Sequence, residues 1–312
     1  EGFETMVRLS DAPLMIIEGD EYLSSCQDKV PKIWHYRPHM SIITGVSWDH
    51  MNVFPTIEDY HSAFTGYLER MPAGAYVYYD GYDQALEQLV MPYHSVHQLQ
   101  SYAPFDFNLS DGKVVLRLKS GNVPLQIFGR HNLANLKAAW LILQRLGVPE
   151  QQFGASIRRF TGASKRLQIL CESSDHVTYQ DFAHAPSKVK ATVQAVRSLY
   201  PFRKLTACVE LHTFSSLNKE FLPQYGHTMD ECDVAAVFFS DHTLKMKKMP
   251  PLTHEDIESA FQRSDVILFK DRNALQEYLG TQSWKDHNLL LMSSGTFGGL
   301  DLERLCDLTI SV

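Results

Sequence analysis

Two short segments near the start of the chain carry the residue types of a metal site. Glu18, Asp20 and Glu21 lie in the segment IEGDEY, and Asp49 and His50 lie in the segment VSWDHMNVFP; each segment ends an apolar run. We expect these runs, 14–22 and 40–49, to be neighbouring buried parallel strands, whose ends lie about 4.8 Å apart. A carboxylate and an imidazole placed there could share one magnesium or manganese ion beside a phosphate. The alternative is that both are ordinary residues at strand ends.

Three further segments carry residues suited to a phosphate-bearing ligand. GRHNLANLKAA places His131 and Asn132 at the start of an expected helix, where they could recognise a purine edge or simply cap the helix. GASKRL contains Arg166, which could neutralise phosphate or stand solvated. YQDFAHAPSKVKAT sets Asp181 and His184 in a loop before a helix, an arrangement that binds anions in some proteins and nothing in others.

Other catalytic patterns do not occur in the sequence. G-x-S-x-G and H-E-x-x-H are absent, and the glycine-rich stretch SSGTFGG does not match G-x-G-x-x-G. The five cysteines are scattered and form no C-x-x-C pair. We therefore expect neither covalent catalysis nor a zinc or thiol redox site, and the cysteine pattern favours a reducing cytoplasm.

The bulk composition is that of a globular protein with two domains. The chain has 312 residues, of which 44% are apolar and 21% are charged. The net charge of −7 and the lack of a basic stripe argue against nucleic acid as a partner. No apolar run approaches the roughly 20 residues of a membrane helix, so we expect no membrane association.

The first half of the chain is expected to mix helices with strands. The run 56–71 has apolar residues at helical spacing behind Thr56, a suitable N-cap. A strand is expected at 75–81, and turns at SDGK and SGNV predict hairpins within 108–129. The strongest helix signal covers 130–149, and a shorter helix follows at about 150–160.

The second half alternates more regularly, which indicates βαβ units and a parallel sheet. Strands are expected at 176–182, 204–211, 234–240, 265–269 and 288–293, with helices at 187–199, 217–232, 253–263 and 273–279. Ligands of such sheets bind beyond the carboxyl ends of the strands, where DFAHAP, ELHTF and SSGTFGG fall. We place the domain boundary in TGASKRL, so that the domains are 1–162 and 163–312.

Taken in order, these motifs resemble the Mur ligase family, the ATP-dependent amide-forming enzymes of peptidoglycan assembly. The resemblance runs through IEGDEY, HYRPHMSIITGVSWDHMNVFP, GRHNLANLKAA, GASKRL, YQDFAHAPSKVKAT and LLMSSGTFGGL. It implies an α/β fold in which residues 1–162 form part of a central ATPase domain, a parallel sheet with helices plus a small β-rich part. Residues 163–312 would form the Rossmann-like C-terminal domain.

The resemblance also implies roles for the residues around ATP and Mg²⁺. Glu18 and His50 match the magnesium-binding glutamate and histidine of the family, and Asn132 matches the asparagine that contacts adenine, with His131 beside it. Such enzymes phosphorylate a substrate carboxylate with ATP, and an amine then attacks the acyl phosphate.

The resemblance assigns three residues of the second domain to the same reaction. Arg166 and Asp181 match residues that reach ATP when the domains close. His184 matches a histidine that faces the incoming amine and the acyl phosphate. In the family pattern HHP a second histidine follows, whereas Ala185 stands there in this chain.

The segments HYRP and FGGL are most similar to the recycling branch of the family. Those enzymes join L-Ala-γ-D-Glu-meso-diaminopimelate to UDP-N-acetylmuramate. An L-alanine-adding ligase is the alternative, but Thr213 and Ser216 stand where such enzymes carry arginines, and a hydroxyl does not replace a bidentate guanidinium. A non-catalytic nucleotide-binding module is the third reading.

One family motif is missing from the sequence. The phosphate loop G-x-x-G-K-[ST] should precede IEGDEY and occurs nowhere, and no UDP-binding domain precedes it. We therefore expect a trimmed chain that is inactive by itself, since nothing else here supplies the lysine and backbone nest that hold the β- and γ-phosphates.

Overall fold

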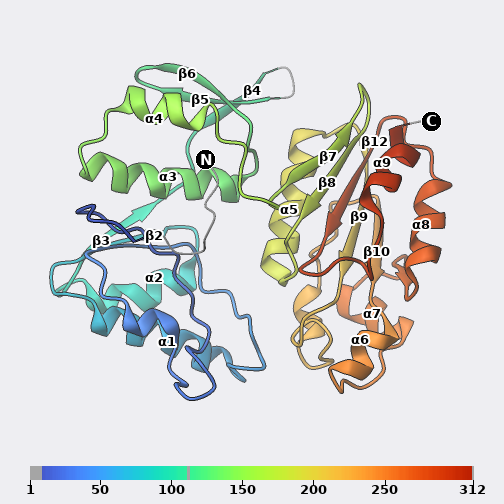
Figure 1. Cartoon of the computed structure of the whole chain (residues 1–312), viewed down its shortest axis with the longest axis horizontal. Coiled ribbons are helices and arrows are strands. Elements are labelled where there is room, and N and C mark those ends of the chain that lie inside the picture. Colours follow the sequence, from blue (N-terminus) through green and yellow to red (C-terminus); the bar gives the residue numbers. More distant parts are fainter. Residues whose placement is uncertain (1–8, 111–112, 311–312) are drawn as a thin grey trace.

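The computed structural model describes residues 9–110 and 113–310, which form two α/β bodies lying side by side (Figure 1). The first body contains all elements up to α4 and the second contains all elements from β7 onward. The segment 158–167 connects them and contains the boundary predicted at 162, which stays a prediction. None of the helices in the described ranges is long and apolar enough to cross a membrane.

The first body holds two small sheets. Strands β1, β2 and β3 form a parallel sheet in that order, and β4, β5 and β6 form an antiparallel one. Its elements are η1 (Lys32–His35), β1 (Met40–Ile43), α1 (Ile57–Arg70), β2 (Tyr76–Asp80), α2 (Gln84–Val90), η2 (Met91–Tyr93), β3 (Gln98–Tyr102), β4 (Phe107–Ser110), β5 (Lys113–Leu118), β6 (Gly121–Leu125), α3 (Arg130–Arg145) and α4 (Glu150–Ile157).

The local signals for helices in this body are confirmed. Helix α1 begins after Thr56, whose hydroxyl accepts from the Asp59 N–H at 3.1 Å while the Asp59 carboxylate accepts from the Thr56 N–H at 3.2 Å. This reciprocal capping box satisfies two amide groups that the helix itself leaves free. Helix α3 ends before Gly147, which has a φ of 77° as a helix-ending glycine requires.

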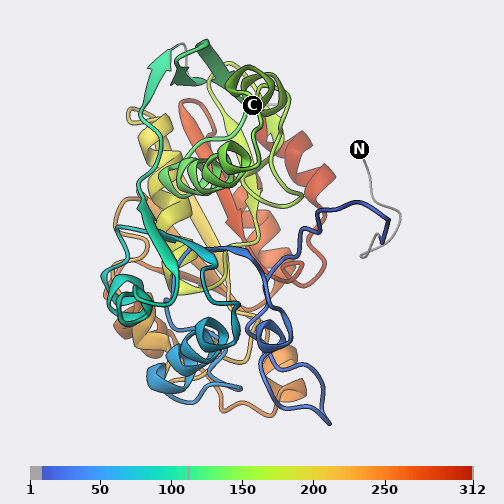
Figure 2. The same cartoon turned by 90° about the vertical axis from the view of Figure 1, so that its left-hand side faces the viewer.

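The predicted strand at 14–22 is wrong. This stretch forms no ladder with another described strand, and its apolar residues from Leu14 to Ile17 are 46–89% exposed. A strand needs a continuous ladder to satisfy its N–H and C=O groups, whereas this run accepts backbone bonds only near its end, from Ile33 to the Asp20 carbonyl and from Lys32 to the Tyr22 carbonyl, within the described residues. Figure 2 shows this dark-blue stretch running along the outside of the molecule.

The strand predicted at 40–49 is real but shorter. It ends at Ile43, because the chain then leaves the ladder and the Val46 N–H bonds the Asp83 carboxylate at 3.0 Å. The hairpins predicted between 108 and 129 form, although Asp111 and Gly112 of the SDGK turn lie outside the described residues. The SGNV turn is displaced, since Leu118 pairs with Gly121.

The second body is a six-stranded sheet in the order β11-β10-β9-β12-β8-β7. All neighbours are parallel except β7, which runs antiparallel to β8. Its elements are β7 (Gln168–Glu172), β8 (Val177–Asp181), α5 (Pro186–Leu199), β9 (Lys204–Glu210), η3 (Leu222–Tyr225), β10 (Val234–Phe238), α6 (Asp241–Met246), α7 (His254–Phe261), β11 (Ile267–Phe269), α8 (Arg272–Gly280), β12 (His287–Met292) and α9 (Leu302–Ile310).

Helices cover both faces of this sheet. Alternate residues of β10 divide between two apolar clusters: Ala235 and Val237 join the one that includes α5 and α7, while Ala236 and Phe238 join the one that includes α8 and α9. Because both faces of these strands are buried, their sequences are continuous apolar runs. The parallel strands and Rossmann-like layering predicted for this half are confirmed.

The helix predicted at 217–232 is wrong. The stretch contains only the short 3₁₀ helix η3, which has Pro223 near its start and Gly226 at its end. Proline lacks an N–H and its ring clashes with the preceding turn, so the apolar spacing does not extend into an α-helix. Strand β7 and helices α6 and α9 were not anticipated from the sequence.

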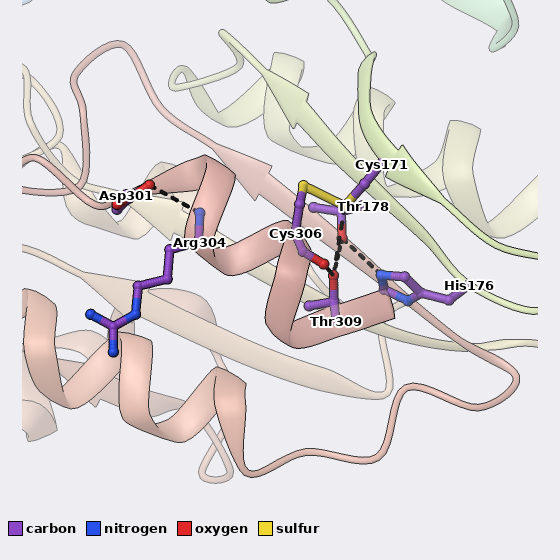
Figure 3. The surroundings of a disulfide bond; sticks show 7 residues. All are labelled: Cys171, His176, Thr178, Asp301, Arg304, Cys306 and Thr309. Atoms are coloured by element: carbon purple, nitrogen blue, oxygen red, sulfur yellow. Dashed lines mark hydrogen bonds between the residues drawn. A yellow bond between two sulfur atoms is a disulfide. The ribbon is translucent and has the colours of Figure 1, made fainter. Parts of the chain in front are cut away.

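A disulfide closes the edge of the second body. Figure 3 shows Cys171 on β7 bonded to Cys306 on α9, beside the hydroxyl groups of Thr178 and Thr309. The two cysteines lie 135 positions apart in sequence and their Cα atoms are 5.8 Å apart. The bridge therefore holds the last described helix against the edge strand, and the cysteine spacing did not predict this pairing.

We expect reduction of this bridge to lower the free energy of unfolding by about 2–4 kcal/mol, because a cross-link over so long a loop restricts the unfolded chain. Chemical unfolding with and without reductant measures the difference. The Cys171→Ser variant should show no response to reductant, which separates this bridge from the free thiols of Cys26, Cys208 and Cys232. A wild-type protein whose stability ignores reductant would contradict the prediction.

Candidate functional site

A cavity of about 230 Å³ lies where the two bodies meet. One wall comes from the first body and the other from loops beyond β9 and α6 of the second. The lining residues are Tyr22, Asp49, His50, Asn52, His212, Thr213, Phe214, Ser215 and Lys247. The cavity therefore joins the WDH segment to the ELHTF segment, which the sequence placed beyond a strand end.

Direct contacts fix the two walls relative to each other. The Met51 N–H donates to the Ser215 hydroxyl at 3.0 Å. The rings of Trp48 and Phe221 pack edge to face, with centroids 5.5 Å apart. Because these contacts flank Asp49 and His50 in the chain, both residues lie at the junction of the two bodies.

Asp49 and His50 form the polar part of the first wall. Asp49 is 7% exposed, its Oδ1 accepts from the His50 N–H at 2.7 Å, and its Oδ2 has no hydrogen-bond partner. The His50 Nε2 lies 4.0 Å from that unpaired oxygen and 3.6 Å from Glu21 Oε1. A buried oxygen without a partner is costly, so this group of atoms suits a bound cation or an N–H donor.

The predicted partner of His50 lies elsewhere. Glu18 is exposed, and the carboxylate beside His50 is that of Glu21. Within the described ranges, no cluster of three or more histidine, cysteine, aspartate or glutamate side chains is arranged to hold a metal ion. The magnesium role of Glu18 and His50 stays a prediction, and Glu21 and Asp49 are the acids that the fold actually brings to His50.

His131 and Asn132 begin helix α3 close to Arg166. The Asn132 amide donates to the Phe128 carbonyl at 2.9 Å, which agrees with a local structural role. The His131 Nδ1 is buried without a partner. Burial, with a smaller contribution from the Arg166 charge, lowers the pKa of His131 to about 4. The His131 Nδ1, which has no hydrogen-bond partner, could bond a nucleotide base or ribose. The assignment of His131 and Asn132 to ATP stays a prediction.

Lowering the pH should reduce the free energy of unfolding through the buried, neutral His131. The folded pKa lies below the unfolded value of about 6.5, so the unfolded state binds the extra proton and stability falls between pH 6.5 and 4. His131 contributes a loss of at most about 3 kcal/mol below pH 4, and none above pH 6.5. The His131→Gln variant should lose less stability than wild type from pH 7 to 4.5 in urea titrations. Parallel losses in the two proteins would refute this.

Asp181 joins the loop after β8 to the segment that connects the two bodies. Its two carboxylate oxygens accept from the N–H groups of Leu167 and Ala183, each at 2.6 Å. Burial raises the pKa of Asp181, against the opposing effect of these two bonds and of Arg166. The Arg166 guanidinium lies 5.1 Å from the centroid of the Phe182 ring. The predicted ATP contacts of Arg166 and Asp181 stay predictions, and in this structure Asp181 holds the segment that carries Arg166.

His184 is buried in the loop that precedes helix α5 of the second body. Its Nδ1 lies 2.9 Å from the Phe182 carbonyl, and its own carbonyl accepts from the Tyr225 hydroxyl. Burial lowers the pKa of His184, while the Asp49 charge opposes this effect. Burial thus favours the neutral imidazole, the form that can accept a proton from an amine, and the catalytic role of His184 stays a prediction.

The sequence reasoning did not identify the groups on the second wall as functional. Glu210, at the end of β9, is 4% exposed and accepts from the Ser293 hydroxyl and from the Phe297 N–H at 2.7 Å. Its other oxygen lies 3.6 Å from the His212 Nδ1. The glycine-rich stretch after β12 is therefore anchored to the carboxylate that orients His212. The placement of ELHTF and SSGTFGG beyond neighbouring strands was the available signal.

Comparison with known sequences agrees with this architecture. A sequence model described as the Mur ligase middle domain matches residues 4–143, and one described as the Mur ligase, glutamate ligase domain matches residues 165–295. The chain belongs to the Mur ligase family and carries sequence of its middle and C-terminal domains. The predicted fold class is confirmed.

Curated relatives of these Mur ligase domains are longer than this chain. The UDP-N-acetylmuramate–L-alanine ligase of Streptococcus equi subsp. zooepidemicus is 28% identical over 235 residues, which are 72% of this chain and 50% of that protein. The enzyme of the same name from Lactobacillus delbrueckii subsp. bulgaricus is 27% identical over 282 residues, 87% of this chain and 62% of that protein. The chain thus spans about half the length of the first relative.

Solved structures share the fold of these Mur ligase domains. MurF from Thermotoga maritima in complex with ADP superposes with a TM-score of 0.64 at 18% identity, covering 88% of this chain and 62% of that one. The murein peptide ligase from Psychrobacter arcticus superposes with a TM-score of 0.57 at 18% identity, covering 94% and 62%. At these identities the similarity shows the fold alone.

Proposed function

We propose that the complete protein carrying this chain is an ATP-dependent ligase that joins an amine to the carboxylate of UDP-N-acetylmuramate. The cavity between the two bodies is the observation that carries the proposal. It places the unpaired oxygen of Asp49 and the imidazole of His50 opposite residues of the second domain. A two-substrate ligation needs such a site, because nucleotide and amine must meet away from water.

ATP with Mg²⁺ would supply the phosphoryl group that turns the substrate carboxylate into an acyl phosphate. His50 and Glu21 would help to hold the cation, and His131 and Arg166 would hold the nucleotide. The neutral His184 would take the proton that the amine loses during attack. The hydrogen bond from the Met51 N–H to the Ser215 hydroxyl would hold the two domains together beside the cavity.

L-alanine is the amine that the relatives favour. The curated relatives named above are UDP-N-acetylmuramate–L-alanine ligases, so we place free L-alanine ahead of the recycled tripeptide suggested by HYRP and FGGL. The tripeptide remains the second candidate for one reason. Thr213 and Ser216, which replace the expected arginines, bond each other at 3.0 Å and offer no guanidinium to a carboxylate. We expect either reaction to take place in the cytoplasm, as part of peptidoglycan synthesis or recycling.

A competition assay tests this proposal. The complete protein would receive ATP, Mg²⁺ and UDP-N-acetylmuramate with equal L-alanine and tripeptide, and mass spectrometry would identify the product. A predominant L-alanyl product supports the first candidate and a predominant tripeptide product supports the second. A folded protein that binds nucleotide but forms neither product would contradict ligase function and favour a non-catalytic module.

A further inference from the structure

The two walls of the cavity carry opposite charges. Asp49 presents a buried carboxylate oxygen without a hydrogen-bond partner on the first wall. On the second wall Lys247 is half-buried directly after α6, and among the described residues no carboxylate forms an ion pair with it. A carboxylate oxygen without a hydrogen bond and an ammonium group without a carboxylate partner therefore line one small space.

The position of Lys247 is fixed by an aromatic ring. Its Nζ lies 4.1 Å from the centroid of the Phe214 ring, and both residues line the cavity. A cation held over an aromatic face keeps its donors directed away from the ring, and part of its hydration is already lost. Lys247 is the one ammonium group on this wall within the described residues. The neighbouring Thr213 and Ser216 hydroxyls bond each other and carry no charge.

We propose that Lys247 binds the α-carboxylate of a free amino acid, whose amino group is directed toward Asp49. An amino acid carries its ammonium and carboxylate groups on the same carbon atom, which matches a carboxylate oxygen without a hydrogen bond opposite an ammonium group, and the cavity volume of about 230 Å³ suits a small amino acid. This inference rests on the proposed ligase function and specifies its amine substrate. It also explains how such a substrate is recognised without arginines at 213 and 216, since a lysine binds a carboxylate as a point charge.

The charge on the substrate provides the test. The complete protein would be assayed with L-alanine and with L-alaninamide, which keeps the amine and lacks the carboxylate. We expect wild type to prefer L-alanine by about 10- to 100-fold in kcat/KM, as for a charge-assisted hydrogen bond. Lys247→Gln should remove most of this preference and leave the KM for ATP unchanged, and Lys247→Arg should restore much of it. The control Lys245→Gln changes an exposed lysine of α6 outside the cavity.

Several outcomes would overturn the inference. Lys247→Gln could keep the full preference for L-alanine, or it could raise the KM for ATP instead, which would place Lys247 at phosphate. A wild-type enzyme that uses only the tripeptide would also refute it. If wild type ligates no amine, the proposed function fails separately. Calorimetric titration of both compounds into nucleotide-loaded wild type and Lys247→Gln then decides the inference, and equal L-alanine affinity of the two proteins would reject it.

Discussion

Replacement of His50 by glycine is expected to lower the ligation turnover of the complete protein by about 10²- to 10³-fold. The imidazole is the group that lies between Glu21 and the unpaired oxygen of Asp49, at the meeting point of the two bodies. Removal of one group that stabilises developing charge in a closed site has costs of this size. Initial rates of phosphate release at saturating substrates give the turnover.

Glycine is chosen because of the backbone at His50. Its φ is 56°, a value that glycine adopts without strain, so the substitution removes the ring and keeps the loop. His227 is the matched control, because it also has a positive φ, of 61°, and its side chain is 62% exposed. His227→Gly should turn over at the wild-type rate. A His50→Gly enzyme within threefold of wild type would remove His50 from the reaction.

Gly129→Ala is expected to cost about 4 kcal/mol of folding stability. Gly129 precedes α3 with a φ of 88°, and an added Cβ would lie 2.7 Å from the Cβ of Ala195 on α5 and 3.0 Å from His131. The cost combines about 1–3 kcal/mol of backbone strain with about 1–3 kcal/mol of overpacking. Because Ala195 belongs to the second body, the clash acts on the contact between the domains.

Gly147→Ala separates these two contributions. Gly147 also has a positive φ, of 77°, but nothing lies within 4 Å of its added Cβ. We expect this control to lose only about 1 kcal/mol in guanidinium unfolding, from strain alone. The double variant Gly129→Ala with Ala195→Gly should recover part of the loss of Gly129→Ala. Equal losses for the two single variants would show that the close approach of α3 and α5 contributes nothing.

Local patterns determined the longest helices of the first domain and most strands of the second. The capping box of Thr56, the apolar spacing before Gly147 and the continuous apolar strands all act within a few residues, so the sequence alone predicts α1, α3 and the parallel strands β8, β9, β10 and β12. The ordered motifs also predicted the family, since they occur over nearly the whole chain.

Contacts between distant segments were decided only by the tertiary structure. The run 14–22 is apolar enough for a strand, but no described strand lies beside it, so its carboxylates are displaced and Glu21 rather than Glu18 reaches His50. The Cys171–Cys306 bridge and the pairing of Lys247 with Phe214 also depend on how the chain folds back on itself. Spacing along a sequence records periodicity within an element, whereas a site between two domains depends on their relative placement, and no local pattern encodes that placement.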